Sequence, residues 1–321
     1  MRISVTGASG AIGSRLCTHL AQAGFEVRAL VRPGSVPKNL YHRSIEIIAG
    51  DVTVPGSMAG FVAGSHSVIH AAGLKKAARE RTLHRQNVTG TSTLADACHQ
   101  HEVQHLIYIS SLAAQGPSER GRPHRHGGNE APCNPYGYSK LAAEGILKKH
   151  PIAPRTTVIR PGLIYGPDAS ALIPWIRWVG IGIVPVVPSM QLSFLYLDDL
   201  VRTLSFLIPK QASFGPHFLV SSPPVLMANL VDLIEGQLEQ RPAVRLFTNR
   251  RLLKFALGPM QKASASLGVA PGVTKVMNEL SEESWAVAES TNAWLQDQIP
   301  FTPMEEGIRA LIEWCRQTGR L

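Results

Sequence analysis

The sequence predicts an α/β protein whose core is a doubly wound parallel sheet, followed by a smaller C-terminal lobe. Three observations lead to this fold class. Short apolar strands alternate with helical segments up to Arg160, a glycine-rich turn joins the first strand to the first helix, and glycine and proline become frequent after Arg160. Strands that alternate with helices of this length indicate βαβ units, which build buried parallel sheets.

The individual elements follow from residue periodicity along the chain. Short β-branched or apolar runs predict strands at 2–6, 26–31, 45–49, 67–70, 105–109 and 156–159, and helical spacing predicts helices at 11–23, 54–62, 83–101 and 136–150. Further along, we expect strands at 192–197 and 217–221 and helices at 198–208, 226–239 and 304–317. We place the first domain at 1–165 and the second lobe at 166–321, with 191–222 returning to the first domain's sheet.

Composition limits the class of protein. With 321 residues, 44% hydrophobic and 17% charged, the chain has enough apolar surface for a full core, which excludes disorder. The longest nearly uncharged apolar stretch, 179–188, is about half of the ~20 residues that a membrane span needs, and glycines interrupt the first residues too early for a signal peptide. Four separated cysteines without CxxC spacing indicate neither a disulfide framework nor a metal site. We therefore expect a soluble protein of a reducing cytoplasm.

The chain is basic, with 32 Lys and Arg against 23 Asp and Glu and a formal net charge of +9. A nucleic-acid-binding face would interleave basic with aromatic residues, but aromatics make up only 6% of this chain, so we expect no nucleic-acid partner. The excess charge either lies on solvated surface or neutralises an anionic ligand.

The turn after the first strand has the composition of a phosphate-binding loop. Gly7 allows a tight turn, Gly10 lets the backbone approach a pyrophosphate, and Gly13 lets the helix pack closely on the strand. The following helix offers N–H groups and the positive end of its dipole to the anion. A glycine trio also serves plain turns, but in the first βα unit of an alternating chain it predicts a dinucleotide-binding domain over 1–165 and a substrate lobe over 166–321.

The end of the second strand bears on the choice of dinucleotide. A carboxylate there would bind the ribose hydroxyls of NAD, but the segment Arg28-Ala-Leu-Val-Arg32-Pro-Gly-Ser35 has no Asp or Glu. Arg32 is placed to pair with a 2′-phosphate, helped by Arg28 or Ser35. We therefore predict NADP as the preferred cofactor, with NAD as the alternative if Arg32 is only a solvated residue.

The third strand is followed by Asp51 and Val52. This position faces the adenine end of a dinucleotide, which Asp51 would meet with its side chain and Val52 with its backbone. Asp51 has a second interpretation, as the cap of the helix that follows.

A proton-transfer set is predicted at the carboxyl ends of the next strands. Tyr136 and Lys140 are four residues apart on a predicted helix, so they lie on one face. A phenol with a pKa near ~10 is a poor base, but a neighbouring ammonium favours the phenolate. Ser111, at the end of the fifth strand, can bind a substrate oxygen. Tyr138 is a rival to Tyr136, but the residue four positions after it is alanine.

Together these motifs resemble those of the extended short-chain dehydrogenase/reductase family, also called the NAD-dependent epimerase/dehydratase family. The resemblance keeps the family's order and spacing up to Asp199 and includes a similar ending at 302–309. It is carried by Thr6-Gly7-x-x-Gly10-x-x-Gly13, Asp51-Val52, His70-Ala-Ala, Asn87-Val-x-Gly90-Thr, Ser110-Ser111, Tyr136-x-x-x-Lys140, Arg160-Pro161, Tyr165-Gly166-Pro167 and Tyr196-x-Asp198-Asp199.

The resemblance implies a Rossmann-type domain in which Tyr136 is the acid/base, Lys140 binds the nicotinamide ribose and Ser111 donates to the substrate oxygen. Family members are often dimers, so we expect a homodimer. The predicted cofactor-binding residues follow the strand ends: Gly7, Ser9, Gly10, Ala11, Ile12, Gly13, Arg32, Asp51, Val52, Ala71, Ala72, Gly73, Tyr136, Lys140 and Pro161.

Two departures from the family pattern bear on the substrate. Sugar-nucleotide epimerases usually have an asparagine where this chain has Leu163, and Gln115 replaces a common tyrosine. The segment 160–166 looks more like hydroxysteroid dehydrogenases and dihydroflavonol-type reductases. The apolar run 172–184 would favour an apolar substrate by about 0.8 kcal/mol per buried CH₂, unless its Trp175 and Trp178 belong to the core or to a dimer face.

Three functions are consistent with these features. The first is an alcohol/ketone or aldehyde oxidoreductase with a small, moderately apolar substrate. The second is a nucleotide-sugar epimerase or dehydratase, although Leu112 and Ala113 stand where a dehydratase would want an acid beside the serine. The third is a catalytically silent dinucleotide-binding scaffold or redox sensor, a class that generally loses the tyrosine and lysine retained here.

Overall fold

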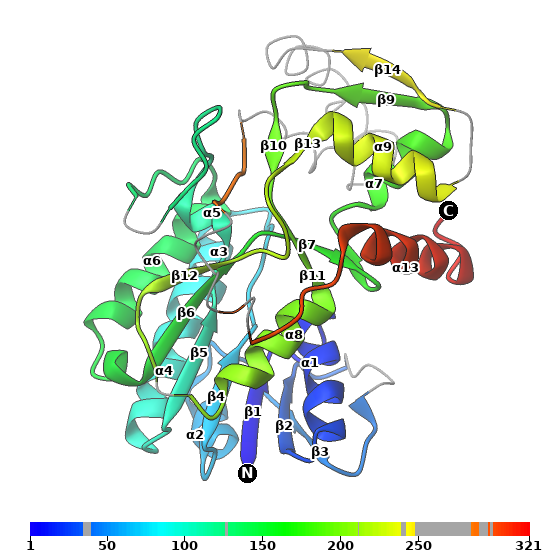
Figure 1. The fold of residues 1–321 in the computed structure, drawn as a ribbon. Coiled ribbons are helices and arrows are strands. Elements are labelled where there is room, and N and C mark those ends of the chain that lie inside the picture. The colour runs from blue at the N-terminus through cyan, green and yellow to red at the C-terminus, as the bar shows by residue number, and fades with distance from the viewer. Residues whose placement is uncertain are drawn as a thin grey trace. The chain divides into compact units, whose positions relative to one another are not determined.

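The computed structural model describes residues 1–34, 40–125, 128–210, 212–238, 242–247, 284–288, 295 and 298–321 (Figure 1). The chain forms two compact units. Unit 1 consists of Met1–Gly116, Asn129–Pro161 and Asp198–Leu219, and unit 2 consists of Pro117–Gly128, Gly162–Leu197 and Val220–Leu321.

Unit 1 is built on a seven-stranded sheet in which neighbouring strands are all parallel. The strand order is β12-β6-β5-β4-β1-β2-β3. This arrangement confirms the predicted doubly wound sheet of Rossmann type. The strands are β1 (Arg2–Thr6), β2 (Glu26–Val31), β3 (Ile45–Ala49), β4 (Ser67–His70), β5 (His105–Ile109), β6 (Thr156–Pro161) and β12 (Pro216–Leu219).

The strand order fixes where a ligand can bind. From β1 the chain proceeds outward through β2 and β3, then returns to place β4 on the other side of β1. The order therefore reverses between β1 and β4. In open α/β sheets, ligands bind beyond the carboxyl ends of the strands at such a switch point. Thr6 and His70, which end β1 and β4, mark that place.

Helices cover both faces of the sheet (Figure 1). Apolar side chains of α2, α4 and α6 form one buried core cluster with strand residues that include Val68, Leu106 and Val158. Figure 1 shows α1 and α8 on the other side, where Arg15 of α1 pairs with Asp198 of α8 at 2.7 Å. The helices of unit 1 are α1 (Ala11–Gln22), α2 (Pro55–Val62), α3 (Glu80–His84), α4 (Gly90–Gln100), α5 (Leu112–Gln115), α6 (Pro135–Lys149) and α8 (Leu197–Leu207).

The predicted continuous helix over 83–101 is wrong in one respect. A π-helical turn, Arg85–Thr89, separates α3 from α4. Within this turn the Asn87 side chain accepts a hydrogen bond from Leu74 N at 2.7 Å and donates one to Ser139 Oγ at 2.8 Å. Widened turns of this kind occur frequently at functional sites, where they redirect one side chain.

The described residues of unit 2 form three small sheets. Its strands are β7 (Leu163–Gly166), β8 (Ala169–Ser170), β9 (Ile183–Val186), β10 (Gln191–Leu192), β11 (Phe194–Tyr196), β13 (Val225–Leu226) and β14 (Val244–Phe247), paired in the orders β11-β7-β8, β10-β13 and β14-β9. Of the segment 191–222, expected to return to the large sheet, β12 does so, whereas β11 pairs with β7 instead. The β11–β7 pairing is long-range, and periodicity within one strand does not reveal its partner.

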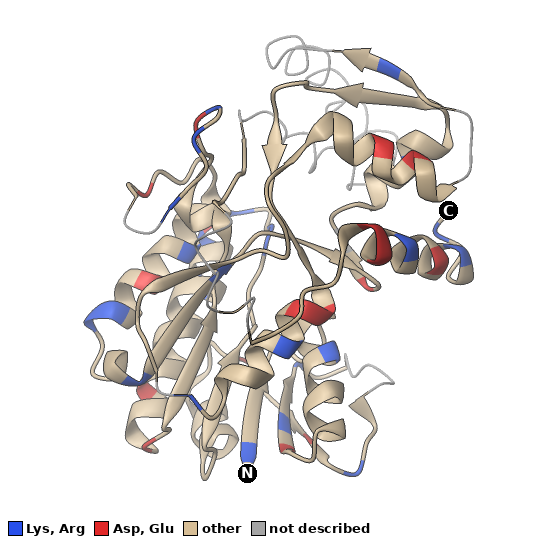
Figure 2. Ribbon diagram, in the orientation of Figure 1, with Lys and Arg blue, Asp and Glu red and all other residues tan. Residues whose placement is uncertain are grey.

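Among its described residues, unit 2 has the helices α7 (Ile173–Gly180), α9 (Met227–Leu238) and α13 (Met304–Gln317). Trp175 is buried and packs edge-to-face on Trp178 with ring centroids 5.1 Å apart, so Trp175 serves the core of this unit. None of the helices in the described segments is long and apolar enough to cross a membrane. Lys and Arg are spread over both units rather than concentrated on one element (Figure 2).

Candidate active site

The glycine loop between β1 and α1 is tight enough to require glycine at two positions. Gly7 has a φ of +68°, and a Cβ there would lie 2.7 Å from Ala72 N. A Cβ at Gly13 would lie 2.2 Å from the carbonyl oxygen of Gly7. A Cβ at Gly10 would have only that carbonyl oxygen within reach, at 3.4 Å. Gly7 and Gly13 therefore bring backbone against backbone, as a loop that wraps a phosphate requires.

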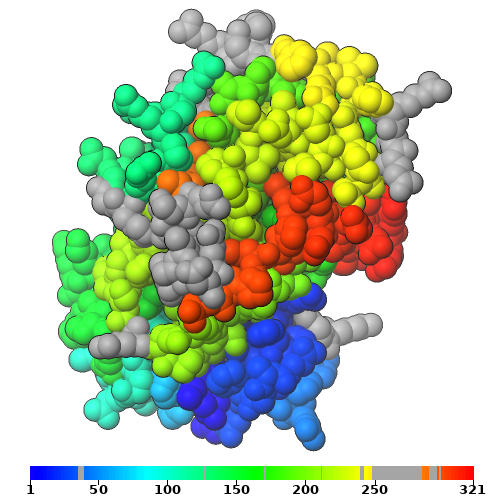
Figure 3. All heavy atoms as spheres, in the orientation of Figure 1, coloured from blue at the N-terminus to red at the C-terminus, as the bar shows by residue number. Residues whose placement is uncertain are grey.

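The helix that leaves this loop presents an uncapped N-terminus. Gly10 is the N-cap of α1, no described side chain caps it, and the first turn has no acidic residue. The first N–H groups of a helix have no partner within the helix, and the dipole makes this end positive. Ser9, Ala11 and Ile12 are half-buried at this end. In Figure 3 the atoms of the N-terminal βαβ segment, drawn in blue, form a continuous surface.

The carboxyl end of β4 packs against this loop through a buried histidine. Thr6 Oγ1 lies 2.7 Å from His70 Nδ1 and accepts a hydrogen bond from Ala72 N at 3.1 Å. His70 Nε2 lies 3.0 Å from Thr91 Oγ1, which donates its own proton to Asn87 O at 2.6 Å. Because the Thr91 proton is committed, His70 donates from Nε2 and accepts at Nδ1, which is a neutral imidazole. Burial, together with the positive charge of Lys140, lowers the pKa of His70 to about 3.

The ends of β2 and β3 bring Arg32 near Asp51. Partial burial opposes ionisation of Asp51, but hydrogen bonds from Thr53 and the charge of Arg32 lower its pKa. Asp51 Oδ1 accepts from Thr53 N and Thr53 Oγ1, both at 2.8 Å, whereas the N-cap of α2 is Val54. The interpretation of Asp51 as the cap of that helix is therefore wrong. Val52 is buried, and Gly90 allows α4 to pack onto it, because a Cβ at Gly90 would lie 2.7 Å from Val52 Cγ2.

The sequence suggests Arg28 and Ser35 as residues that help Arg32 to bind a 2′-phosphate. Arg28 is engaged on the side of the sheet, where its Nε donates to Glu46 at 2.8 Å and its NH1 donates to Ala63 O at 2.6 Å. These contacts remove Arg28 from the predicted phosphate-binding set. Ser35 lies outside the described residues.

Helix α6 carries the predicted tyrosine and lysine. It begins after Asn134, whose side chain accepts from Gly137 N at 2.8 Å, and Pro135 occupies the first turn. Asn at the N-cap and Pro at the next position are strong helix-start signals. Tyr136 is half-buried in the first turn, whereas its rival Tyr138 is 60% exposed. The helix start therefore separates the two phenols onto different faces.

Lys140 is buried at the end of β5. Its Nζ donates to Ile109 O at 2.7 Å and lies 4.6 Å from the ring centroid of Tyr108. Burial lowers the pKa of Lys140 to about 7, a shift that Glu144 opposes and Lys75 increases. An ammonium has three protons and Ile109 takes one, so the others can bind hydroxyl groups of a ligand. A Cβ at Gly73 would lie 3.5 Å from Lys140 Nζ, which places the end of β4 beside the lysine.

Ser111 is the N-cap of the short helix α5, directly after β5. Its Oγ accepts from Ala113 N at 3.1 Å. Accepting this bond uses a lone pair and leaves the hydroxyl proton for donation. Ser111, Tyr136, Lys140 and the glycine loop all lie in unit 1. Pro161 is buried at the end of β6, in the same unit.

Sequence reasoning found no role for Asn87 or Ser139, although both connect the parts of the site. Asn87 Nδ2 donates to Ser139 Oγ and to Leu74 O at 2.9 Å, and Ser139 Oγ donates to Tyr136 O at 2.7 Å. A chain of hydrogen bonds therefore runs from the glycine loop through His70 and Thr91 to the helix of Tyr136. The only sequence signal was the position of Asn87 in a family motif.

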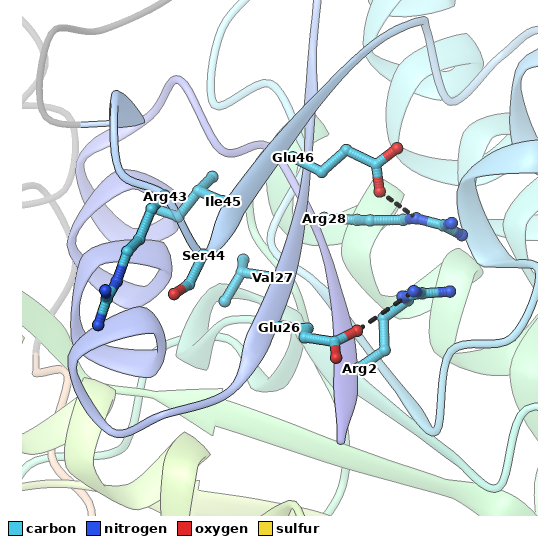
Figure 4. A pocket seen from close by; sticks show the side chains of 8 residues that line it. All are labelled: Arg2, Glu26, Val27, Arg28, Arg43, Ser44, Ile45 and Glu46. Carbon is cyan, nitrogen blue, oxygen red and sulfur yellow. Dashed lines mark hydrogen bonds and ion pairs between the residues drawn. The ribbon is translucent and has the colours of Figure 1, made fainter.

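A pocket of about 190 Å³ lies away from these residues (Figure 4). It lies at the amino ends of β1, β2 and β3, opposite to the ends where the glycine loop and the strand-end residues lie. Figure 4 shows two ion pairs in its lining, Arg2 with Glu26 at 3.2 Å and Arg28 with Glu46 at 2.8 Å. Since these arginines are neutralised and lie at the wrong end of the strands, this pocket is not the candidate active site.

Comparison with known proteins identifies the family. A model of the NAD dependent epimerase/dehydratase family matches residues 3–220. A 3 beta-hydroxysteroid dehydrogenase type 7 of Mus musculus is 33% identical over 183 residues, which cover 50% of each chain. A 2-alkyl-3-oxoalkanoate reductase of Stenotrophomonas maltophilia is 31% identical over 343 residues, which cover 97% of this chain and 98% of the reductase.

Solved structures show the same fold over the whole chain. MoeE5 in complex with UDP-glucose and NAD has a TM-score of 0.74 at 23% identity, and the match covers 99% of both chains. The crystal structure of gox2253 has a TM-score of 0.79 at 22% identity, again with 99% of both chains covered. With the glycine loop, the tyrosine–lysine helix and the family match in agreement, this chain belongs to the NAD-dependent epimerase/dehydratase family of extended short-chain dehydrogenase/reductases.

Proposed function

We propose that this protein is an NADP-dependent oxidoreductase that interconverts an alcohol and a ketone or aldehyde on a small, moderately apolar substrate. The observation that carries the proposal is the buried Lys140, which extends from the helix of Tyr136 to the end of β5, directly before Ser111. Three proton-bearing groups are thereby assigned to one sheet edge, the edge at which the fold binds dinucleotides. The glycine loop provides the matching cradle, since side chains at Gly7 or Gly13 would fill it.

Tyr136, Ser111 and Lys140 each have a separate role in the proton transfer. When bound, the nicotinamide supplies or accepts the hydride. In the reduction, Tyr136 gives its phenolic proton to the substrate oxygen while Ser111 donates a hydrogen bond to the same oxygen. In the oxidation, Tyr136 takes that proton back as phenolate. The ammonium of Lys140 lowers the cost of the phenolate and uses its remaining protons to bind the nicotinamide ribose.

The preference for NADP rests on Arg32 at the end of β2. The guanidinium of an exposed arginine there is suited to a 2′-phosphate, and Asp51, a carboxylate that interacts with Arg32, follows β3 rather than β2. Dissociation constants for NADPH and NADH in wild type and in Arg32→Ala test this assignment. We expect tighter NADPH binding in wild type, with a selective loss in the variant. Equal affinities for both cofactors in wild type would contradict it.

The proposed apolar substrate is supported by the relatives that match. These include a 3 beta-hydroxysteroid dehydrogenase and a 2-alkyl-3-oxoalkanoate reductase, whose names indicate apolar hydroxy- or oxo-substrates. Leu163 stands where sugar-nucleotide epimerases usually have asparagine, which also favours this substrate class over a nucleotide sugar. A panel of alkyl and cyclic ketones with NADPH tests the class. We expect steady NADPH consumption that depends on Tyr136.

A second candidate function is a nucleotide-sugar epimerase, because MoeE5, a structural neighbour, was solved with UDP-glucose and NAD. In that reaction the hydride returns to the same substrate, so UDP-sugar would be converted without net NADPH consumption. Turnover of UDP-glucose together with inactivity on every ketone would favour it. A silent scaffold would bind cofactor tightly and turn over neither class, and its binding of partners would be unchanged in Tyr136→Phe.

We also propose that the protein works in the cytoplasm as a homodimer. The four separated cysteines support a reducing compartment, and dimers are frequent among family members. Sedimentation velocity tests the assembly, since a species of one chain mass across the micromolar range would contradict a dimer.

A further inference from the structure

A buried arginine lies behind the proposed catalytic residues. Arg160 of β6 is 1% exposed, and its guanidinium is hydrogen-bonded on every side. Its Nε donates to Glu144 Oε1 at 3.0 Å, and one NH₂ group donates to both Glu144 and Glu130. The other NH₂ group donates to Gln115 Oε1. Burying a charge of this kind is costly unless it is fully paired, and Glu144, Glu130 and Gln115 supply that pairing.

Glu144 is the residue through which this arginine reaches the site. It is buried on α6, one turn beyond Lys140, and accepts from Arg160 with both carboxylate oxygens. One of these oxygens also accepts from Ser110 Oγ. Ser110 is the residue directly before Ser111. Glu144 therefore joins the helix that carries Tyr136 and Lys140 to the strand end that carries the substrate-oxygen donor.

The same cluster secures the segments on either side. Gln115 lies at the end of α5, the helix capped by Ser111. Its Oε1 accepts a hydrogen bond from Arg160, and its Nε2 donates one to Asn129 O at 2.7 Å. Glu130, which is 39% exposed, contacts Arg160 from the outer edge. The two carboxylates thus differ: Glu144 accepts from both Arg160 and Ser110, whereas Glu130 accepts from Arg160 at the exposed side of the cluster.

We propose that Glu144 is a positioning residue of the active site, which holds Ser111 and the Tyr136 helix in register through Ser110 and Arg160 and supplies the negative charge that keeps Lys140 an ammonium. This inference rests on the proposed oxidoreductase function. Glu144 touches no reacting atom in it. It acts through Lys140 and through the strand end before Ser111.

The charges around Lys140 determine whether loss of Glu144 raises or lowers the pKa of this lysine. Lys140 interacts with Glu144 from its own helix, with His70 from β4 and with Lys75 from the segment after β4. Its Nζ also lies over the ring of Tyr108 from β5, and Tyr108 in turn interacts with Tyr136. His70 is neutral and the pKa of Tyr108 is raised well above 10, first by burial, so neither is charged near neutrality. Glu144 is thus the negatively charged group that opposes deprotonation of Lys140, beside the neutral contacts with Ile109 O and the Tyr108 ring, so its loss lowers the pKa of Lys140.

The test compares Glu144→Gln with the matched variant Glu130→Gln, which removes the same charge from the same arginine without a contact to Ser110. The first readout uses cofactor-free protein: the ¹³Cε NMR signal of Lys140, assigned with Lys140→Arg, is followed against pH. We expect its midpoint to fall by about one unit or more in Glu144→Gln, which is about tenfold in the proton equilibrium. We expect a clearly smaller change in Glu130→Gln. Equal shifts in the two variants, or none in Glu144→Gln, would overturn the proposal.

The second readout is the pH profile of kcat/KM for NADPH-dependent ketone reduction. Its alkaline limb should move to lower pH in Glu144→Gln, in parallel with the NMR midpoint. If Tyr136→Phe is fully active, the proposed function fails whatever Glu144 does. If Tyr136→Phe is inactive while Glu144→Gln has a wild-type profile, the positioning role alone fails.

Ser110→Ala keeps the inference testable if Glu144→Gln does not fold. It removes only the hydroxyl that joins Glu144 to the strand end and leaves the Arg160–Glu144 pair intact. We expect kcat to fall at least about tenfold, with the dissociation constant of NADPH unchanged and the midpoint of Lys140 close to wild type. A wild-type kcat in Ser110→Ala would overturn the role of Glu144 in holding Ser111.

Discussion

Gly137 of α6 lies directly against the carbonyl oxygen of Ala113 in α5: a Cβ on Gly137 would be 2.2 Å from that oxygen. Gly137 follows Tyr136, and Ala113 lies two residues beyond Ser111. The absence of a side chain at one position therefore sets how closely the proposed acid/base and the substrate-oxygen donor approach each other. Backbone contacts of this kind cannot relax by a change of rotamer.

A side chain at position 137 should disrupt catalysis more than stability. In Gly137→Ala, α6 must move away from α5, and a misplacement of about 1 Å costs on the order of 10² in rate. The matched control is Gly145→Ala in the same helix, where nothing lies within 4 Å of the new Cβ. Gly145→Ala should be fully active and more stable by about 0.5–1 kcal/mol, since alanine favours helix over glycine. Equal activity of the two variants would contradict the proposed role of this contact.

The glycine loop should tolerate no side chain at Gly13. In Gly13→Ala the new Cβ would collide with the Gly7 carbonyl and displace the loop from its cradle shape. We expect NADPH affinity to fall more than about tenfold, equivalent to about 1.4 kcal/mol, as measured by calorimetry. Gly60→Ala in α2, with nothing within 4 Å, is the control and should bind normally. Unchanged binding by Gly13→Ala would exclude this loop as the phosphate site.

His70 should make the protein sensitive to acid. Its pKa is about 3 in the folded chain and about 6.5 in an unfolded one, so between these pH values the unfolded chain binds the additional proton. The free energy of unfolding must then fall as pH falls, by up to about 1.4 kcal/mol per pH unit from this group. Urea unfolding between pH 7 and 4.5 measures it.

The comparison for His70 is His70→Gln, with the exposed His101→Gln as control. The dependence of stability on pH should be shallower in His70→Gln than in wild type, whatever its absolute stability. His101→Gln should retain the wild-type slope. Parallel curves for wild type and His70→Gln would show that His70 is not held neutral in the folded state.

The sheet of unit 1 could be predicted because its signals are local. The predicted ranges for β1 to β5 coincide with the observed strands, since short β-branched runs between glycine and proline signals have few alternatives. The break at Arg85–Thr89 could not be predicted, because it depends on the contacts of Asn87 with Leu74 and Ser139. The pairing of β11 with β7 is likewise a tertiary choice.

In the candidate site, too, residues with a local sequence signal could be proposed, whereas tertiary contacts could not. Gly7, Gly13, Ser111, Tyr136 and Lys140 could be proposed from the sequence because each has a spacing that its proposed chemistry requires. The cluster around Arg160 could not, because Glu144, Glu130 and Gln115 are brought to it from separate segments. The contacts of Arg28, suggested as a residue that helps Arg32, could not be predicted for a similar reason: the fold engages it with Glu46 and with the carbonyls of Gly60 and Ala63.

The most direct test of the proposed enzyme is Tyr136→Phe, which removes one hydroxyl and keeps the ring. NADPH oxidation with the best ketone of the panel is measured beside the dissociation constant of NADPH. We predict a loss of about 10² to 10⁴ in kcat with cofactor affinity unchanged, because only proton transfer is removed. Near-normal turnover by Tyr136→Phe would contradict the assignment of this phenol as the acid/base.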